Sequence, residues 1–261
     1  MNKLTQHYEL AKSKYNEDRI VGIFLQGSQN YGLDYEGSDV DSKLIIAPTL
    51  DNIVFNNTPT STTVYLPNDE HIDVKDIRNY CTNFEKQNIN FVEILFTPYK
   101  IMNPLYEELF NPLIVNREKI ARLDQKRAVK AMVGMALEKQ HALEHPYPSK
   151  VEVLYRYGYD PKQLHHIVRL KYFLENYVSG EEYESCLYPI RSQEAFLRKI
   201  KLGEYSLEEA RKLADECILE MKEIENKFLV NDISIDKDAL DVINTVKYNI
   251  VKESLKMDLD K

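Results

Sequence analysis

Two short apolar segments with a polar segment between them constrain the fold of this chain more than any other feature. Residues 19–27 (RIVGIFLQG) and 42–48 (SKLIIAP) are each predicted to form a buried strand, because a short apolar run that ends at Gly or Pro is typical of one. The segment between them begins with Gly27-Ser28 and ends with Asp39-Val40-Asp41. The sequence therefore predicts a sheet whose first strand ends in a Gly-Ser turn and whose second strand follows an Asp-x-Asp pair.

The Asp-x-Asp pair predicts a metal site. Asp39 and Asp41 are two positions apart, so their carboxylates project from the same face of a strand. Two neighbouring carboxylates repel each other, and Mg²⁺ (or Mn²⁺) removes this conflict because it prefers carboxylate and phosphate oxygens. The Gly27-Ser28 turn can bring backbone N–H groups and a hydroxyl up to a phosphate, since glycine has no side chain to block the approach. A metal site beside a phosphate site indicates nucleotidyl or phosphoryl transfer.

A third carboxylate is expected on the strand predicted at residues 70–74. A two-metal reaction needs one near the attacking hydroxyl. Ile72 and Val74 are expected to face the core, so Asp73 is expected to share a face with His71. Asp76 is the competing carboxylate, but it is better placed to cap the helix predicted at residues 76–86.

The remaining pattern divides the chain into an N-terminal α/β part and a mainly helical part. Residues 4–18 are predicted to be helical, 62–66 to form a further strand and 52–61 a loop. Beyond Phe96 long helical patterns dominate, at about residues 121–145, 161–179, 206–229 and 236–257. We therefore expect an α+β fold, with a catalytic domain at residues 1–100 and a helical domain at residues 101–261.

The segment GSQNYGLDYEGSDVD, residues 27–41, resembles the signature of the DNA polymerase β-like nucleotidyltransferase superfamily. More narrowly, it is similar to the bacterial and phage predicted nucleotidyltransferases with a GSxxYG and SDxD core. Residues 73–96 and 157–170 (YGYDPKQLHHIVRL) resemble two further motifs of that narrower family, so the resemblance covers roughly residues 20–175. It implies a nucleotidyltransferase-type mixed sheet with flanking helices, and a helical domain that completes the nucleotide and acceptor cleft.

The resemblance also implies roles for individual residues. Gly27 and Ser28 match the positions that hold the triphosphate. Lys43 stands where the narrower family usually has a basic residue, whereas Ser42 departs from the apolar residue that is usual at its position. The metal-binding and catalytic positions match Asp39, Asp41 and Asp73.

The helical motif contains a basic stripe. Lys162, His166 and Arg169 are spaced i, i+4 and i+7, so they lie along one side of a helix. Directed at the catalytic cleft, this stripe would meet the triphosphate or an acceptor phosphate, through bidentate contacts from Arg and a point charge from Lys. The stripe and the three tyrosines before it also fit ordinary helix packing, with a satisfied interhelical histidine. The tyrosines that could stack on a base are Tyr155, Tyr157 and Tyr159.

The charge balance excludes a protein that coats nucleic acid. The chain has 34 Lys+Arg and 42 Asp+Glu, a formal charge of −8, whereas such coating needs many basic residues for each footprint. Residues 117–171, however, hold 12 basic and 6 acidic residues, a balance of +6. The three widely spaced cysteines predict no disulfide-linked partner, and we expect neither a secretory signal nor a membrane span. A reducing cytoplasm is therefore the expected location.

Together these features predict a Mg²⁺-dependent enzyme that moves a nucleoside monophosphate from an NTP, with ATP favoured, to an acceptor hydroxyl. Pyrophosphate would be the other product, and an RNA 3′ end such as that of tRNA is the preferred acceptor. Other acceptors stay open: a protein hydroxyl, as in AMPylation of a partner such as a toxin, a second nucleotide that yields a messenger, or a small molecule such as an aminoglycoside. A catalytically silent nucleotide-binding module is the alternative from another class.

Overall fold

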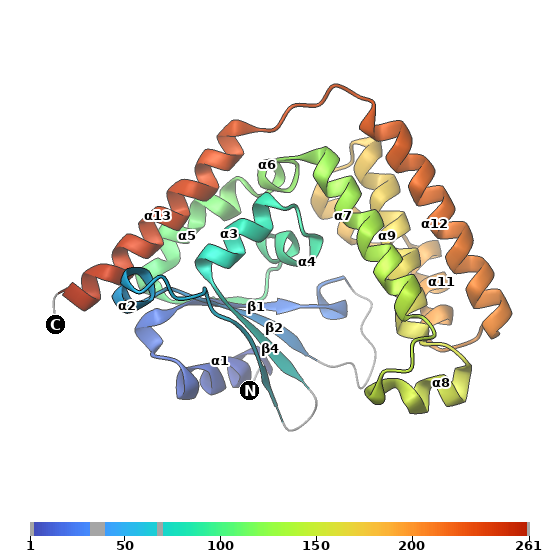
Figure 1. Ribbon diagram of the computed structural model, residues 1–261, viewed down its shortest axis with the longest axis horizontal. Coiled ribbons are helices and arrows are strands. Elements are labelled where there is room, and N and C mark those ends of the chain that lie inside the picture. The colour runs from blue at the N-terminus through green and yellow to red at the C-terminus, as the bar shows by residue number, and fades with distance from the viewer. Residues whose placement is uncertain (1–2, 32–39, 67–69, 260–261) are drawn as a thin grey trace. The chain divides into compact units, whose positions relative to one another are not determined.

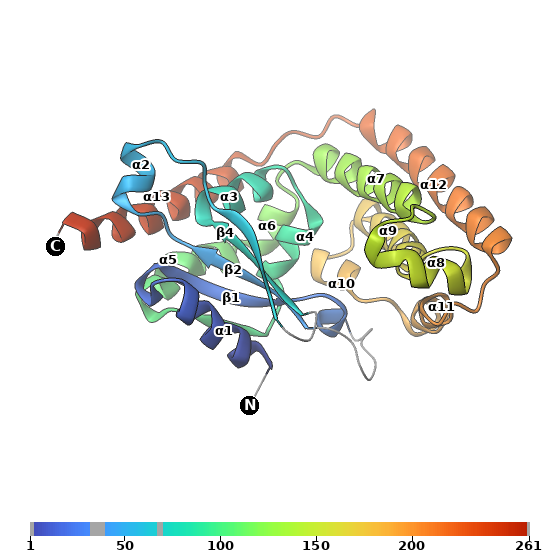
Figure 2. The ribbon, with the colours of Figure 1, turned by 60° about the horizontal axis from the view of Figure 1, so that its bottom comes forward.

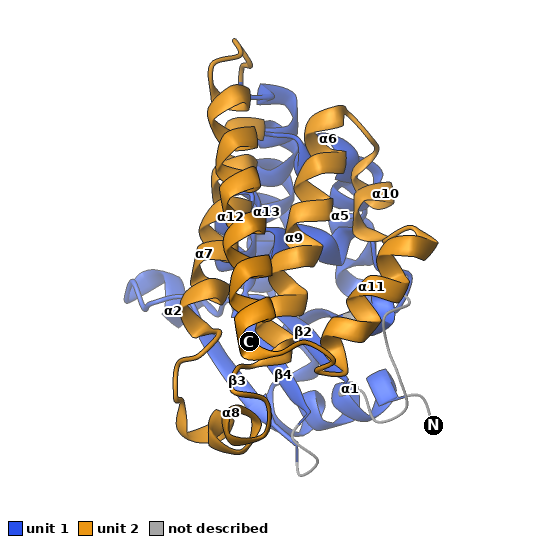
Figure 3. Cartoon of the chain, turned by 90° about the vertical axis from the view of Figure 1, so that its right-hand side faces the viewer, with its two compact units in different colours: residues 1–124, 235–261 blue, residues 125–234 orange. Residues whose placement is uncertain are grey.

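The computed structural model describes residues 3–31, 40–66 and 70–259 (Figure 1). Its fold is α+β, as predicted, with a five-stranded mixed sheet in the N-terminal part and helices in the rest. The chain forms two compact units: unit 1 comprises residues 1–124 and 235–261, and unit 2 comprises residues 125–234 (Figure 3). These bounds differ from the boundary expected near residue 100, because unit 2 is inserted into unit 1.

The sheet of unit 1 has the strand order β3-β4-β2-β1-β5. The β2–β4 pair is parallel, and the other three pairs are antiparallel. Four of these strands were predicted to within two residues, and only the three-residue edge strand β5 was not. The strands are β1 (Ile20–Gln26), β2 (Asp41–Ile46), β3 (Ser61–Tyr65), β4 (His71–Asp76) and β5 (Lys100–Met102).

Helices cover both faces of this sheet (Figures 1 and 2). Helix α1 (Lys3–Lys14) packs on one face, where Leu4 and Ala11 join the buried apolar residues of β2 and β4. Helix α13 (Lys237–Leu259) packs mainly against α3 (Ile77–Glu85) and α5 (Pro104–Val115). The helices on the other side are α3 (Ile77–Glu85), α4 (Ile89–Val92), α5 (Pro104–Val115) and α13 (Lys237–Leu259).

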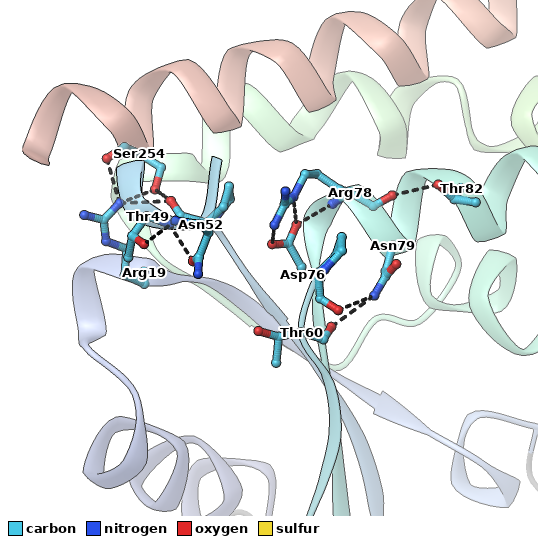
Figure 4. A network of polar contacts seen from close by, with 11 residues as sticks. Arg19, Thr49, Asn52, Thr60, Asp76, Arg78, Asn79, Thr82 and Ser254 are labelled. Atoms are coloured by element: carbon cyan, nitrogen blue, oxygen red, sulfur yellow. Dashed lines mark hydrogen bonds and ion pairs between the residues drawn. The ribbon is translucent and has the colours of Figure 1, made fainter. Parts of the chain in front are cut away.

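A buried guanidinium ties the end of the chain to the first strand (Figure 4). Arg19 donates to the backbone oxygens of Ser254 at 2.7 Å and Pro48 at 3.2 Å, and it forms an ion pair with Asp258. The Ser254 hydroxyl donates in turn to the Pro48 oxygen at 2.7 Å. Hydrogen bonds to a charged donor are the stronger kind. They hold α13 against the N-terminal part of unit 1, although unit 2 separates the two in sequence.

Helix caps agree with the sequence signals. Asp76 caps α3, as predicted, by accepting from the Arg78 N–H at 2.8 Å, and it also binds the Arg78 guanidinium (Figure 4). Ser206 and Glu209 form the capping box at the start of a long helix. Short helical segments were missed, including α2 (Leu50–Val54) in the predicted loop, α6 (Arg117–Ala121), and the 3₁₀ turns Glu17–Arg19, Ser28–Tyr31, Glu93–Leu95 and Pro148–Lys150.

Unit 2 is entirely helical in its regular elements. Its central helix is α9 (Pro161–Ser179), which packs against α7, α11 and α12. The apolar residues of α9 recur with the period of a helix, so they form a continuous face for this packing. The helices are α7 (Gln125–Ala142), α8 (Val151–Tyr157), α9 (Pro161–Ser179), α10 (Tyr183–Leu187), α11 (Arg191–Lys201) and α12 (Leu207–Leu229). Among the described residues, none of these or the other helices is long and apolar enough to cross a membrane. None of the three cysteines, all described, forms a disulfide.

Candidate active site

The turn after β1 is held by a buried asparagine. Asn30 donates from its side chain to the Leu25 oxygen at 2.8 Å and from its backbone to the Gly27 oxygen at 3.0 Å, and it accepts from Thr97 at 2.8 Å. Gly27 has a φ of +94°, and a Cβ there would meet no described atom within 4 Å. Its left-handed backbone, rather than crowding, therefore requires glycine at this position. The predicted phosphate contact of Ser28 concerns a side chain outside those that the structure describes.

Asp41 begins β2 beside this turn. In the strand register it lies opposite Gln26 on β1 and His71 on β4. The His71 Nδ1 lies 2.7 Å from the Asp41 carboxylate, whose side chain is 26% exposed. Because a carboxylate can only accept, this contact places a proton on Nδ1 and orients the Asp41 oxygens. Asp39, the other predicted metal-binding residue, lies outside the described residues.

Asp73 lies on the same face as Asp41 and His71, as the sequence predicts. The Cα partner of Asp73 is Lys43, and the neighbouring Ile72 and Val74 are buried on the opposite face. The Asp73 carboxylate forms ion pairs with Lys43 at 3.2 Å and Lys75 at 3.0 Å. Its predicted place in a metal triad stays a prediction, and a metal would compete there with two ammonium groups.

Lys43 is buried, with 3% of its surface exposed. Burial lowers the pKa of its ammonium, and the nearby Asp73 carboxylate opposes this shift. The Lys43 nitrogen also lies over the Phe91 ring, 4.3 Å from its centroid. A direct contact of Lys43 with a triphosphate, as the resemblance implies, would require Asp73 to release it.

The donor chemistry of this face fits Mg²⁺ or Mn²⁺. Asp41 and Asp73 supply carboxylates from adjacent strands, and carboxylate oxygens are the ligands that these cations prefer. Within the part of the chain that the structure describes, no group of three His, Cys, Asp or Glu residues is arranged to hold a metal. That part excludes Asp39, the first aspartate of the Asp-x-Asp pair. Asp41 is therefore the described residue best suited to bind a cation.

Ser42, which departs from the family pattern, has a buried partner. Its hydroxyl lies 2.8 Å from the His7 Nδ1 on the face of the sheet that α1 covers. Both side chains are fully buried. A buried polar group is tolerated when it is hydrogen-bonded, so the departure leaves the strand well packed.

The basic stripe lies on α9 in unit 2. Lys162 is exposed, and His166 and Arg169 are partly exposed. The pKa of His166 is lowered well below its ordinary value, first by burial and then by the positive charges of Arg169, Lys139 and Lys162. Positive charge therefore gathers on this side of α9, and Lys139 of α7 adds to it. The expectation that the helical part completes the nucleotide and acceptor cleft stays a prediction.

The three candidate stacking tyrosines differ in exposure. Tyr159 is fully buried, and its hydroxyl donates to the Tyr205 oxygen at 3.1 Å. Tyr157 packs its ring against Gly203. Tyr155 alone of the three is well exposed, at 95%. Two of the three therefore serve the packing of unit 2, and Tyr155 is the one able to stack on a base.

Searches against protein-family models and against curated proteins found no match to this chain. Function is therefore inferred from the geometry of the site and from the motif in residues 27–41. Sequence reasoning missed His7, Lys75 and Lys139 as parts of these clusters. His7 and Lys139 show no motif of their own, but Lys75 stands two residues after Asp73 and strand alternation could have found it.

The Lys43–Asp73 pair predicts a stability effect. Lys43→Met should lower the free energy of unfolding by about 1–3 kcal/mol, because the Asp73 carboxylate loses one of its two partners. The double variant Lys43→Met/Asp73→Asn should cost less than the sum of the single changes, by about 0.5–3 kcal/mol. Urea denaturation measures all three variants, and exposed Lys100→Met serves as the control. Strict additivity would contradict the coupling.

His165 predicts a pH dependence. Burial, followed by the charges of Arg169, Lys201 and Lys162, lowers the pKa of its imidazole from 6.5 to about 3. Between these values the unfolded chain binds a proton that folded His165 does not, so stability is lost as pH falls from 6.5 towards 3. His165→Leu should make the slope of unfolding free energy against pH shallower, by at most about 1.4 kcal/mol per pH unit.

Chemical denaturation between pH 4 and 7 would measure this slope for His165→Leu and for the exposed control His145→Leu. The control should keep the slope of the original chain. Part of the slope should persist in His165→Leu as well, because burial also lowers the pKa of His166. Equal slopes for the two variants would contradict the assignment to His165.

Proposed function

We propose that unit 1 carries the catalytic centre of a Mg²⁺-dependent nucleotidyltransferase, which transfers a nucleoside monophosphate from an NTP to an acceptor hydroxyl and releases pyrophosphate. One observation carries the proposal. Gly27 directly follows Gln26, whose register partner is Asp41, and Asp73 lies on the face of Asp41 in the adjacent parallel strand. A glycine turn open to a phosphate therefore adjoins carboxylates suited to a cation.

The residues of this face would act by position and charge. The backbone at Gly27 and Ser28 would receive the triphosphate, and His71 would orient the oxygens of Asp41, as outer partners of metal ligands do. Mg²⁺ held by Asp39 and Asp41, with Asp73 as the third carboxylate, would neutralise phosphate charge and make the acceptor hydroxyl more acidic. Lys43 and Lys75 add positive charge beside Asp73. In such a centre the protein contributes positioning and charge stabilisation, with little covalent catalysis.

We propose an RNA 3′ end, such as that of tRNA, as the acceptor. Support comes from the positive charges of Arg169, Lys139 and Lys162 around His166, whose pKa burial and these charges lower, and from the exposed ring of Tyr155 in unit 2. Within the basic stretch of residues 117–171, Lys171 pairs with Glu220, an acid outside the stretch, and this pair lowers the excess of positive charge. We infer that this stretch contacts a few phosphates rather than a long duplex.

The carboxylate pair can be tested by pyrophosphate release. Asp39→Asn and Asp41→Asn should each lower the rate with the preferred NTP by at least about 100-fold, because each removes charge that stabilises the transition state. All four NTPs should be assayed with total RNA and Mg²⁺. Asp51→Asn, an exposed acid of the same unit, is the matched control and should keep the rate. Undiminished activity in Asp41→Asn would sink the proposal.

The RNA acceptor predicts a salt dependence. Affinity for RNA with a free 3′ end should fall by tens of fold between 50 and 200 mM salt, because a few phosphate contacts release counterions. Lys162→Gln should weaken binding and reduce the salt slope by about one unit. Lys212→Gln, at an exposed lysine of α12, is the control and should leave the slope unchanged. A flat salt response would favour a protein or small-molecule acceptor.

A further inference from the structure

A buried carboxylate contacts the backbone of the acidic motif from the face opposite to Asp41. Glu70 is 3% exposed and immediately precedes β4. Its Oε1 accepts from the Val40 N–H at 3.3 Å and from the Lys3 ammonium at 2.9 Å. Val40 is the residue between Asp39 and Asp41. Glu70 therefore holds the backbone of the motif at its midpoint.

The same carboxylate is linked to the other side of Asp41 through a histidine. The Glu70 Oε2 lies 3.2 Å from the Nε2 of His7, a fully buried residue of α1. The His7 Nδ1 lies 2.8 Å from the Ser42 hydroxyl. Since the Glu70 carboxylate only accepts, Nε2 carries a proton, and in the neutral tautomer Nδ1 accepts from Ser42. One network therefore contacts the residue before Asp41 and the residue after it.

Strand alternation gives this network its significance. Ser42 faces α1, whereas Asp41 faces the opposite side, where His71 contacts its carboxylate. A slip of one residue in β2 would exchange the two faces, so it would separate Ser42 from His7. Buried polar groups of this kind tolerate a single arrangement, because any other leaves them unpaired at a cost.

We propose that Glu70 and His7 are positioning residues, which fix the register of residues 40–42 and thereby place the Asp41 carboxylate for cation binding. The proposal rests on the nucleotidyltransferase function proposed above. Both lie on the face of the sheet opposite to the Asp41 carboxylate, so they would act through the Val40 amide and the Ser42 hydroxyl rather than as ligands of the cation. Apolar residues in place of Glu70, His7 and Ser42 would fill the same space without the cost of burying a charge. They would, however, leave the Val40 N–H without its acceptor.

The affinity for Mn²⁺, measured without nucleotide, distinguishes a positioning role from a general effect on protein stability. Mn²⁺ affinity, measured by electron paramagnetic resonance, should weaken by about 10–100-fold in Glu70→Gln and in His7→Leu, as it does when outer partners of metal ligands are lost. His7→Gln keeps a donor towards Glu70 and should restore part of the affinity. The control is Ile72→Val, which shortens a fully buried side chain on the same face without touching the network. It should keep Mn²⁺ affinity within about twofold.

Two further measurements complete the test. Hydrogen exchange at the Val40 amide should accelerate in Glu70→Gln beyond what the change in global stability accounts for, and in Ile72→Val it should follow global stability. Turnover of Glu70→Gln should fall in kcat with little change in KM for the NTP. If Glu70→Gln fails to fold, Ser42→Ala takes its place in the same measurements, because it removes only a single hydroxyl of the network.

The outcomes distinguish the two proposals. If Asp41→Asn weakens Mn²⁺ binding and activity but Glu70→Gln and His7→Leu behave like Ile72→Val, the positioning role is overturned and the proposed function stands. If Asp41→Asn changes neither Mn²⁺ affinity nor activity, the proposed function fails. Faster Val40 exchange together with weaker Mn²⁺ binding in the network variants supports the positioning role.

Discussion

The parallel pairing of β2 with β4 is the constraint on which the candidate site of unit 1 depends. It sets Asp41 beside His71 and Lys43 beside Asp73, so these four described side chains face one side of two adjacent strands. The same pairing sends Leu44, Ile72 and Val74 to the other side, into the core beneath α1. Because side chains alternate along a strand, core and site are two consequences of one register.

Both faces of these two strands carry buried polar groups, which is costly for a sheet. On one face the Lys43 ammonium is desolvated between Asp73 and the Phe91 ring, and on the other Glu70 is enclosed between the sheet and His7 of α1. A chain that needed only a stable sheet would fill these positions with apolar residues at lower cost. Their presence at the acidic motif therefore agrees with a role in chemistry rather than in stability alone.

Local signals in the sequence predicted four strands and six helices, but they missed others such as α5 and α11 and did not predict the contacts between elements. Four strands follow from apolar runs that end at turn residues, and the Asp76 cap follows from its place before a helical pattern. The ion pair of Lys43 with Asp73 joins residues 30 positions apart, so it depends on the register, which no local pattern gives. The edge strand β5 is too short for a periodic signal, and the return of α13 to unit 1 depends on the buried contacts of Arg19.

The place of α13 has a consequence for the order in which the chain can fold during synthesis. A ribosome releases residues 125–234 before it releases residues 237–259, so the inserted helical unit can be complete while the sheet still lacks the helix that packs on α3 and α5. Until α13 is synthesised, the Arg19 guanidinium has neither the Ser254 oxygen nor the Asp258 carboxylate to bind. The nascent α/β unit therefore exposes apolar surface until α13 has been synthesised, which is the period in which a chaperone would bind it.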